Sequence, residues 1–253
     1  MRENTKRSGT TYLKYIDRTC RMLGGAELVV FYAQDDVRAA FEAAAARHGI
    51  ALSCRRVPIA ELPGTPYAAE LLAGCQAMDP EPLRALPDAR REKGLRHLRE
   101  LNQSGPEAYL SVVAIWVSKV LLMDSLACER DEPGHRFTWV DASVSRFRHK
   151  RQRWNFMAQR MPNEAMAHYG NLMRVNGVRL PLNASFLSAT APIWHKVSER
   201  FEAKLKCAIS QEYAHDEETI LALCHAETPD LFYTLGDMHG LIRRKLANIT
   251  GSL

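Results

Sequence analysis

The stretch LVVFYAQDDVRAAFEAAAARHGIALSCRRVPI, residues 28–59, decides the fold class. It opens with a short apolar run, residues 28–32, of the kind that is buried in a parallel sheet. The alanine-rich residues 37–48 predict a helix, which Asp35 and Asp36 can cap. Residues 50–59 predict a second strand. Strands alternating with helices indicate an α/β protein.

The same alternation continues on both sides of this stretch. Apolar residues at helical spacing predict a helix over residues 13–23, which Gly24 and Gly25 end. Further along the chain we expect a strong amphipathic helix at 107–127 and a buried strand at 137–140 that ends in Asp141. An apolar segment follows at 182–190, and further helices begin near Pro192 and at 215–218. A turn at 236–240 then precedes a basic C-terminal helix.

We interpret residues 1–253 as a single domain with two departures from the alternating pattern. Prolines punctuate residues 60–106, and their neighbours at 90–99 are highly charged, which predicts surface helices and loops inserted between core elements. Residues 145–165 form a basic loop. Arginine and lysine there alternate with aromatic residues, a mixture that suits either nucleic acid or a solvated loop beside an anionic substrate. We favour the second for one isolated patch.

The composition is that of an ordinary globular protein, with 46% hydrophobic and 25% charged residues and a formal net charge of +5. The six cysteines are scattered and contain no CxxC pair, so we expect reduced thiols in a cytoplasm. We find no uninterrupted apolar run of roughly 18 residues and no secretory signal. No Walker loop, GxGxxG or GxSxG motif is present, which argues against an NTPase, a dinucleotide enzyme and an α/β-hydrolase.

Asp141 is the most informative single residue. An acidic side chain directly after an apolar strand lies at the carboxyl edge of a sheet, where open α/β folds bind ligands. Its carboxylate suits Mg²⁺ or Mn²⁺, and Ser143 points the same way in extended chain. The alternative is an aspartate that starts a turn or caps a helix.

Three other positions offer functional groups, each with a simpler explanation. Lys119, within an apolar helix, could reach a phosphate or pair with a carboxylate, but such lysines usually extend to solvent. Asp216 and Glu217 could bind or activate an acceptor hydroxyl, although acids at a helix start also complement the helix dipole. His239 could ligate a metal, but it lies in no metal-binding motif.

Several segments, in order, resemble the HtrL/WlaTC-like bacterial glycosyltransferases, which are associated with surface polysaccharide and lipooligosaccharide assembly. The most specific are YLSVVAIWVSK at 109–119 and FTWVDAS at 137–143. Supporting segments are YLKY at 12–15, the run at 28–32, residues 182–190 with Trp194, Asp216-Glu217 with Leu221, and PDLF at 229–232 with Gly236-Asp237.

The resemblance implies a GT-A-like, Rossmann-like fold: a mixed, mostly parallel central sheet flanked by helices, with a nucleotide-sugar site at the strand ends. Asp141 would match the acidic motif that binds metal and diphosphate, although the usual motif is Asp-x-Asp. The expected donor and cofactor contacts are Lys119, Trp139, Asp141, Ser143, Asn183 and Ser185. The expected metal ligands are Asp141 and His239, and the expected catalytic acids are Asp216 and Glu217.

The function implied is transfer of a sugar from a nucleotide-diphosphate sugar to a saccharide or glycolipid acceptor. We expect a divalent metal, Mn²⁺ or Mg²⁺, and a cytoplasmic protein that can associate peripherally with the inner face of the membrane, without a specific nucleic acid. Members of the family usually begin with one more strand, so an impaired or catalytically inactive glycosyltransferase-like scaffold is one alternative. A basic nucleic-acid-binding protein is the other.

Overall fold

The computed structural model describes residues 9–23, 25–81, 93–130, 134–146, 161–171, 174–175, 178–210 and 216–237. The described residues combine helices and strands, which confirms the predicted α/β class, although the two kinds alternate strictly only over residues 9–56. Residues 147–160 of the predicted basic loop and the predicted C-terminal helix lie outside the described residues.

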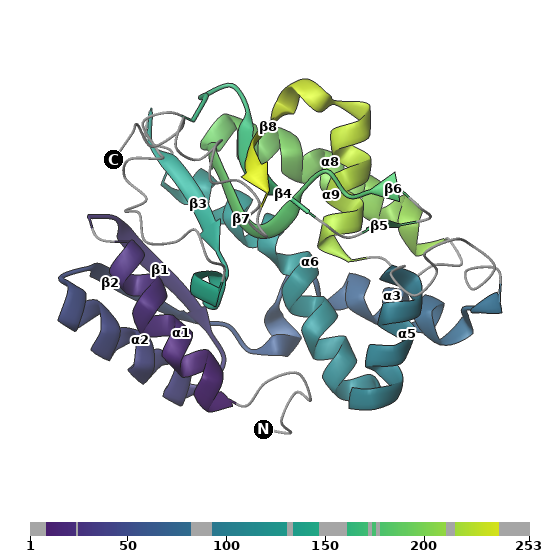
Figure 1. Ribbon diagram of the computed structural model, residues 1–253, viewed down its shortest axis with the longest axis horizontal. Coiled ribbons are helices and arrows are strands. Elements are labelled where there is room, and N and C mark those ends of the chain that lie inside the picture. The colour runs from purple at the N-terminus through teal and green to yellow at the C-terminus, as the bar shows by residue number, and fades with distance from the viewer. Residues whose placement is uncertain are drawn as a thin grey trace.

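The N-terminal part is a small parallel sheet covered by helices (Figure 1). It consists of α1 (Gly9–Met22), β1 (Glu27–Tyr32), α2 (Asp35–His48) and β2 (Ala51–Arg56). β1 and β2 pair in parallel, with Val30 beside Cys54. Ile16, Val30 and Phe41 bring both helices and β1 into one core cluster. This part of the fold follows the sequence pattern closely.

The predicted cap of α2 is wrong in detail. The residue before its first turn is Gln34, which makes no side-chain capping hydrogen bond. Asp35 and Asp36 lie inside the first turn, and Asp36 accepts a hydrogen bond only from the adjacent Val37 N–H, at 2.9 Å. Both acids still complement the positive end of the helix dipole.

The larger sheet has four strands in the order β3-β7-β4-β8. Their bounds are β3 (Arg136–Val140), β4 (Met166–Gly170), β7 (Asn183–Thr190) and β8 (Phe232–Asp237). β7 is antiparallel to both β3 and β4, while β8 is parallel to β4. The sheet is therefore mixed, as predicted.

The expectation of one mostly parallel central sheet does not hold for these four strands. The chain returns from β4 to β7 through a two-stranded antiparallel hairpin, β5 (Arg174–Val175) and β6 (Val178–Arg179), and not through a helix. A connection without a crossover helix leads to antiparallel neighbours. Within the described residues, β1 and β2 form a separate sheet, and their pairing is parallel.

Two further predictions around the larger sheet need correction. Gly236 and Asp237, expected in a turn, are the last residues of β8. The strand that ends before Asp141, expected to be buried, is only half-buried, with Thr138 exposed, because it lies at the sheet edge and pairs with β7 alone. The fully buried strands are β4 and most of β7.

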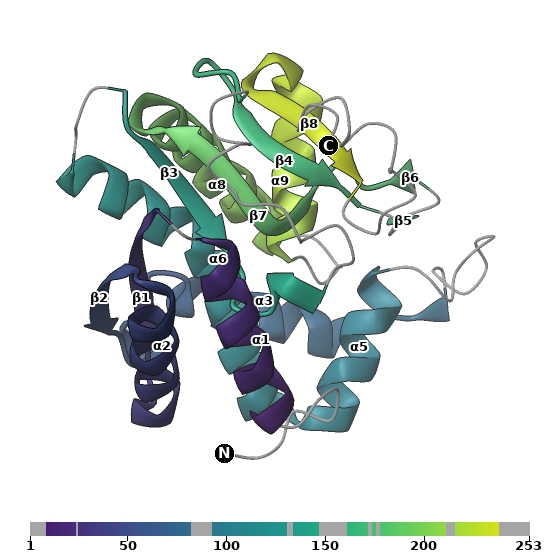
Figure 2. The ribbon, with the colours of Figure 1, turned by 60° about the vertical axis from the view of Figure 1, so that its left-hand side comes forward.

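Three helices pack on one face of the larger sheet: α6 (Pro106–Glu129), α8 (Ala191–Ile209) and α9 (Glu217–Glu227) (Figure 2). The spacing of apolar residues predicts the inward faces of α8 and α9, and this is confirmed, since Val197, Phe201 and Ile220 are completely buried. On the opposite face of the sheet, Tyr169, Phe186 and others form a second, smaller cluster.

α6 runs through the centre of the molecule and supplies much of the main core. Among the described residues it is also the helix whose length and composition would allow it to cross a membrane, and half of that apolar window is buried inside the protein. We had expected no apolar run of this length.

The segment at 60–106 is helical, as predicted, but it is not only a surface insertion. It contains α3 (Thr65–Ala77) and α5 (Lys93–Ser104). α3 buries Ala68, Leu71 and Cys75 in the main core. Gly64 lies so close to α6 that its N–H donates to Ser118 Oγ at 2.8 Å, and a Cβ at that position would clash with the same oxygen. The prolines therefore bound helices that pack on α6.

Candidate functional site

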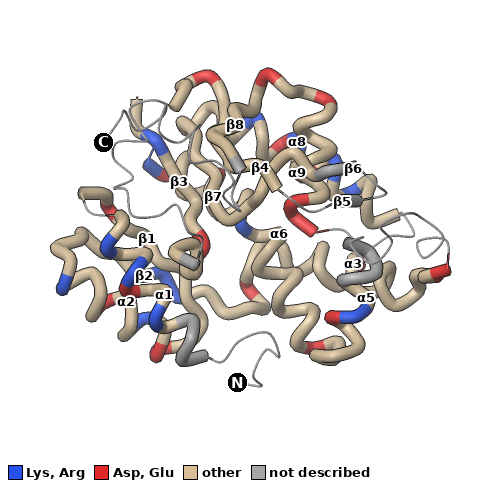
Figure 3. The backbone as a smooth tube through the Cα atoms, viewed as in Figure 1, with Lys and Arg blue, Asp and Glu red and all other residues tan. Residues whose placement is uncertain are grey.

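Polar residues lie together at the end of the larger sheet where β3, β4 and β8 finish and β7 begins. β3, β4 and β8 run in the same direction and β7 runs against them, so three strand ends and the start of β7 lie together. Acidic positions at the start of α9 lie beside α6 near the middle of the molecule (Figure 3). This edge is where an open α/β fold binds ligands.

Asp141 follows the last residue of β3, and both its backbone and its side chain make hydrogen bonds. Its backbone N–H donates to the Ser185 carbonyl at 3.0 Å, which continues the pairing of β3 with β7. Its Oδ1 accepts hydrogen bonds from Trp139 Nε1 at 3.0 Å and from Lys119 Nζ at 3.1 Å. The side chain remains 22% exposed, so solvent or a ligand can still reach it. The carbonyl of Asp141 also accepts from Val144 N–H, so the residue starts a turn as well.

Lys119 joins Asp141 to Glu217 across the space between α6 and α9. Its Nζ lies 2.7 Å from Glu217 Oε1, and its side chain is 5% exposed. Burial by itself would lower the pKa of Lys119, but the charges of Asp141 and Glu217 and their hydrogen bonds outweigh it and hold the pKa above its ordinary value. The lysine is therefore a buried cation and does not extend to solvent.

These three residues, the Lys119–Asp141–Glu217 trio, carry two carboxylates and one ammonium. One net negative charge is left at the strand edge. The ammonium also lies 5.9 Å from the centre of the Trp139 ring, within range of a cation–π interaction. The geometry thus brings together Lys119, Trp139, Asp141 and Glu217, which the sequence analysis had singled out separately.

Asp216 caps α9, which differs from the predicted catalytic role. Its Oδ1 accepts from Thr219 N–H at 2.9 Å and from Thr219 Oγ1 at 2.8 Å. Its Oδ2 lies 3.2 Å from His97 Nε2, and His97 Nδ1 in turn contacts the Tyr109 hydroxyl. The residue is 5% exposed. A buried capping carboxylate with these partners is poorly placed to receive a proton from a substrate.

Glu218 completes the acidic run that begins with Asp216 and Glu217, and the sequence gives it no role of its own. Its Oε1 accepts from Asn183 Nδ2 at 2.9 Å and from Ala184 N–H at 3.2 Å, while Oε2 accepts from Asn171 Nδ2 at 2.8 Å. Asn171 directly follows β4, a strand that we had not predicted. The sequence pattern could not predict the contacts of Glu218, because its donors lie in β7 and directly after β4. Only the pairing of these two strands brings the donors together.

The remaining predicted donor contacts lie at the same edge but are mostly enclosed. Ser143, Asn183 and Ser185 are 5%, 7% and 4% exposed. Asn183 Oδ1 accepts from Ser185 N–H at 3.0 Å, which ties the start of β7 together. His239 lies outside the described residues, so its predicted metal contact cannot be placed.

Two places in the described residues have suitable metal ligands. Asp141 offers a partly exposed hard oxygen beside a net negative charge, which fits Mg²⁺ or Mn²⁺, because these ions often take one protein carboxylate with phosphates and waters. Asp124, Cys128 and His195 form a second group with mixed oxygen, sulfur and nitrogen ligands. The two places are chemically different.

No protein-family model matches the chain, and neither a curated protein nor a solved structure matches it significantly. The case for a function therefore rests on the residues and the geometry described above.

Proposed function

We propose that this protein is a glycosyltransferase that moves a sugar from a nucleotide-diphosphate sugar to a saccharide acceptor. The observation that carries the proposal is the position of Asp141: a partly exposed carboxylate at the end of β3, oriented by Trp139 and Lys119 within a net negative trio. The similarity of residues 109–119 and 137–143 to the HtrL/WlaTC-like family supports it, and a GT-A-like arrangement of the strands is part of the proposal.

Asp141 would hold a divalent cation, with Ser143 close by in sequence. When bound, such a cation supplies Lewis-acid stabilisation of a departing diphosphate. The remaining coordination positions would be open to phosphate oxygens and water. The fixed position of Asp141, set by two hydrogen bonds to its Oδ1, keeps the carboxylate oriented before a ligand arrives.

Lys119 acts in this scheme as a positioning residue. Its ammonium is buried and already bound to two carboxylates, so contact with the diphosphate would require breaking one of those ion pairs. Its contribution is to hold Asp141 and Glu217 at a fixed separation. The sequence names Lys119 as a donor contact that could reach a phosphate, and the burial of its ammonium favours the positioning role instead.

On the acceptor side, Glu217 is the better candidate of the two predicted acids, because Asp216 is occupied by the cap of α9. One Glu217 oxygen accepts a charge-assisted hydrogen bond from Lys119. Glu217 is 5% exposed, like Asp216, so the cap and not burial separates the two acids. We assign Glu217 to binding and orienting acceptor hydroxyls. A saccharide or glycolipid acceptor, cell-surface polysaccharide or lipooligosaccharide synthesis, and peripheral membrane association belong to the same proposal.

The test is to measure thermal stability with a panel of uridine, guanosine and other nucleotide-diphosphate sugars in the presence of Mn²⁺. A bound donor at one hundred times its dissociation constant stabilises the folded state by about 2.7 kcal/mol. We expect Asp141→Asn to remove the shift produced by the donor. Asp230→Asn, which changes an exposed acid in the 3-10 turn before β8, should retain it.

Each rival function gives a different result in the same experiment. A nucleic-acid-binding protein would show no nucleotide-sugar shift and would bind a DNA or RNA oligonucleotide with an affinity that falls steeply with salt. An inactive scaffold would be folded and would respond to neither. An equal donor shift in Asp141→Asn and wild type would refute the assigned role of Asp141.

A further inference from the structure

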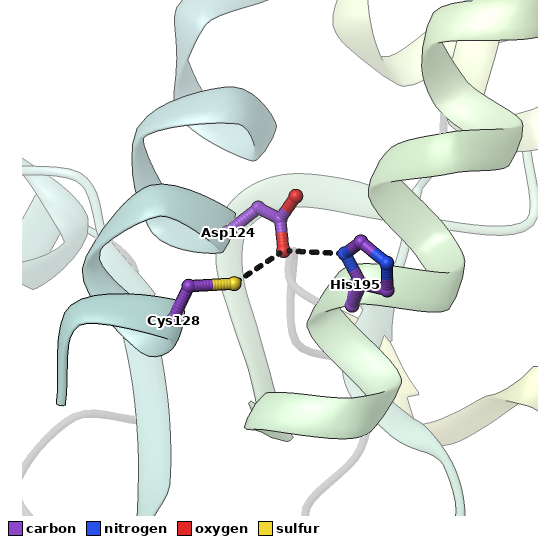
Figure 4. A group of neighbouring side chains, drawn as sticks. All are labelled: Asp124, Cys128 and His195. Carbon is purple, nitrogen blue, oxygen red and sulfur yellow. Dashed lines mark hydrogen bonds and ion pairs between the residues drawn. The ribbon is translucent and has the colours of Figure 1, made fainter. Parts of the chain in front are cut away.

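A second group of ligand-type side chains lies on the surface between α6 and α8, away from the trio. Asp124 and Cys128 are one helical turn apart on α6, and His195 faces them from the first turns of α8 (Figure 4). The nearest ligand atoms of the three side chains all lie within 4.8 Å of one another. We call this group the α6–α8 cluster.

Two of the three distances within the cluster are close to the edges of a tetrahedral coordination shell, and the third, between Cys128 and His195, is within 4.8 Å. For bonds of typical length to zinc, the nitrogen–oxygen edge of a tetrahedron is about 3.4 Å and the sulfur–oxygen edge is about 3.6 Å. In the structure, His195 Nδ1 lies 3.4 Å from Asp124 Oδ1, and Cys128 Sγ lies 3.8 Å from the same oxygen. A metal could therefore be accepted with little movement of the side chains.

The backbone that carries these ligands is rigid. α6 and α8 pack against each other through buried residues that include Met123, Ala127 and Val197. Trp194, next to His195, is completely buried, and its Nε1 donates to the Phe137 carbonyl at 3.0 Å. Ligands on packed helices hold their geometry better than ligands on loops.

The other ring nitrogen of His195 lies near a second carboxylate. His195 Nε2 lies 3.6 Å from Glu199 Oε1, one turn further along α8. When Nδ1 binds a metal, the proton of the neutral ring is on Nε2, the nitrogen that faces Glu199. Metal-binding histidines usually donate their other N–H to a carboxylate in this way.

We propose that the α6–α8 cluster is a binding site for a zinc-class transition metal that cross-links α6 to α8. Thiolate and imidazole ligands select Zn²⁺ over Mg²⁺ and Mn²⁺, so the site is distinct from any cation at Asp141. Binding deprotonates the Cys128 thiol, and the proton passes to solvent as the sulfur–metal bond forms. His195, 57% exposed, and the exposed Cys128 leave a path for the metal and room for a water ligand.

Co²⁺ is the direct probe, because a thiolate ligand to Co²⁺ gives a charge-transfer band in the near ultraviolet. We would titrate the full chain, without an affinity tag and under a metal-free reductant, and expect the band to saturate at one equivalent. Cys128→Ser should abolish it. Cys207→Ser, which changes an exposed cysteine of α8 outside the cluster, should leave it unchanged.

Zn²⁺ should displace Co²⁺ and raise the melting temperature of wild type, but not of Cys128→Ser or His195→Ala. Glu199→Gln should weaken Zn²⁺ binding by roughly 10-fold, at the lower end of the range for outer-shell partners. Failure to form the band, or a band of equal strength in Cys128→Ser, would overturn the proposal. All of these positions are at the surface, so circular dichroism should show that the variants remain folded.

Discussion

α6 carries charged residues in two settings, around Lys119 and further along the helix at Asp124 and Glu129. The two settings differ mainly in solvent exposure. Lys119 is 5% exposed by its side chain and is bound to two carboxylates, whereas Asp124 and Glu129, further along the same helix, are 21% and 47% exposed. A buried charge must be paired, because the interior solvates it poorly. An exposed one is solvated with or without a partner. The ammonium of Lys119 is therefore part of the fold, whereas the partly exposed carboxylates of Asp141, at 22%, and Asp124, at 21%, remain available for ligands.

The largest effect should come from removing the buried cation. Lys119→Met removes the ammonium that both Asp141 and Glu217 contact, and we expect a loss of about 3–5 kcal/mol in the free energy of unfolding. Glu129→Gln, on the same helix at the surface, should change it by less than about 1 kcal/mol. Urea unfolding of both variants makes the measurement.

A double variant separates loss of the ion pair from loss of packing. Lys119→Met with Glu217→Gln removes the repulsion, so it should be more stable than Lys119→Met alone. If Lys119→Met were as stable as wild type, the trio would not be a buried ion network in solution.

The next prediction concerns the pH dependence of stability that a buried histidine causes. His168 is completely buried in β4, and burial lowers its pKa from 6.5 to about 4. Between these values the unfolded chain binds a proton that the folded chain does not. Stability is therefore complete above pH 6.5 and falls as the pH drops toward about 4, by roughly 3 kcal/mol.

Urea unfolding measured from pH 7 to pH 4.5 would show this loss. His168→Gln should flatten most of the profile, with a remainder from His225, whose pKa burial also lowers. A wild-type profile that is flat over this range would contradict the buried neutral state of His168.

A smaller effect should distinguish two acids at helix starts. Asp216→Ala removes the cap of α9 and the partner of buried His97, and we expect a loss of about 2 kcal/mol. Asp35→Ala, in the exposed first turn of α2, should cost only about 0.3 kcal/mol, because the acid there contributes mainly through the helix dipole. Equal losses, measured by urea unfolding, would mean that Asp216 does not act as the cap.

The smallest effect is expected at a surface ion pair. Arg55 Nη1 lies 2.7 Å from Glu129 Oε2, with side chains 35% and 47% exposed. Arg55→Gln should lower the free energy of unfolding by less than about 1 kcal/mol, and added salt should reduce even that difference. A loss comparable to that of Lys119→Met would show that solvent exposure does not control these energies.

Much of the fold could be predicted because helices and regular strands leave local patterns. The faces of α8 and α9, and the parallel pair β1 and β2, follow from the spacing of apolar residues. β4 was missed, because Met166-Ala167-His168-Tyr169-Gly170 has neither alternation nor β-branched residues. This segment is a buried strand because it lies between β7 and β8 in the sheet. A local sequence pattern contains no information about these neighbours.

The candidate site shows the same division. Asp141 could be identified because a carboxylate directly after an apolar strand has a position set by the strand itself. The role of Asp216 could not, because an acid at a helix start has the same pattern whether it caps the helix or meets a substrate. The contacts of Glu218 could not be predicted, because its partners lie in β7 and directly after β4.

The sequence by itself determined most of the helices and the strands β1, β2 and β3, which faces of α8 and α9 point inward, and that an acid would stand at the end of β3. These properties depend on residues a few positions apart. The tertiary structure alone decided that Lys119 meets Asp141 and Glu217, and that Asp124, Cys128 and His195 share one surface. Such contacts join residues distant in sequence, and they exist only once packing of the apolar faces has fixed how α6 lies against α8 and α9.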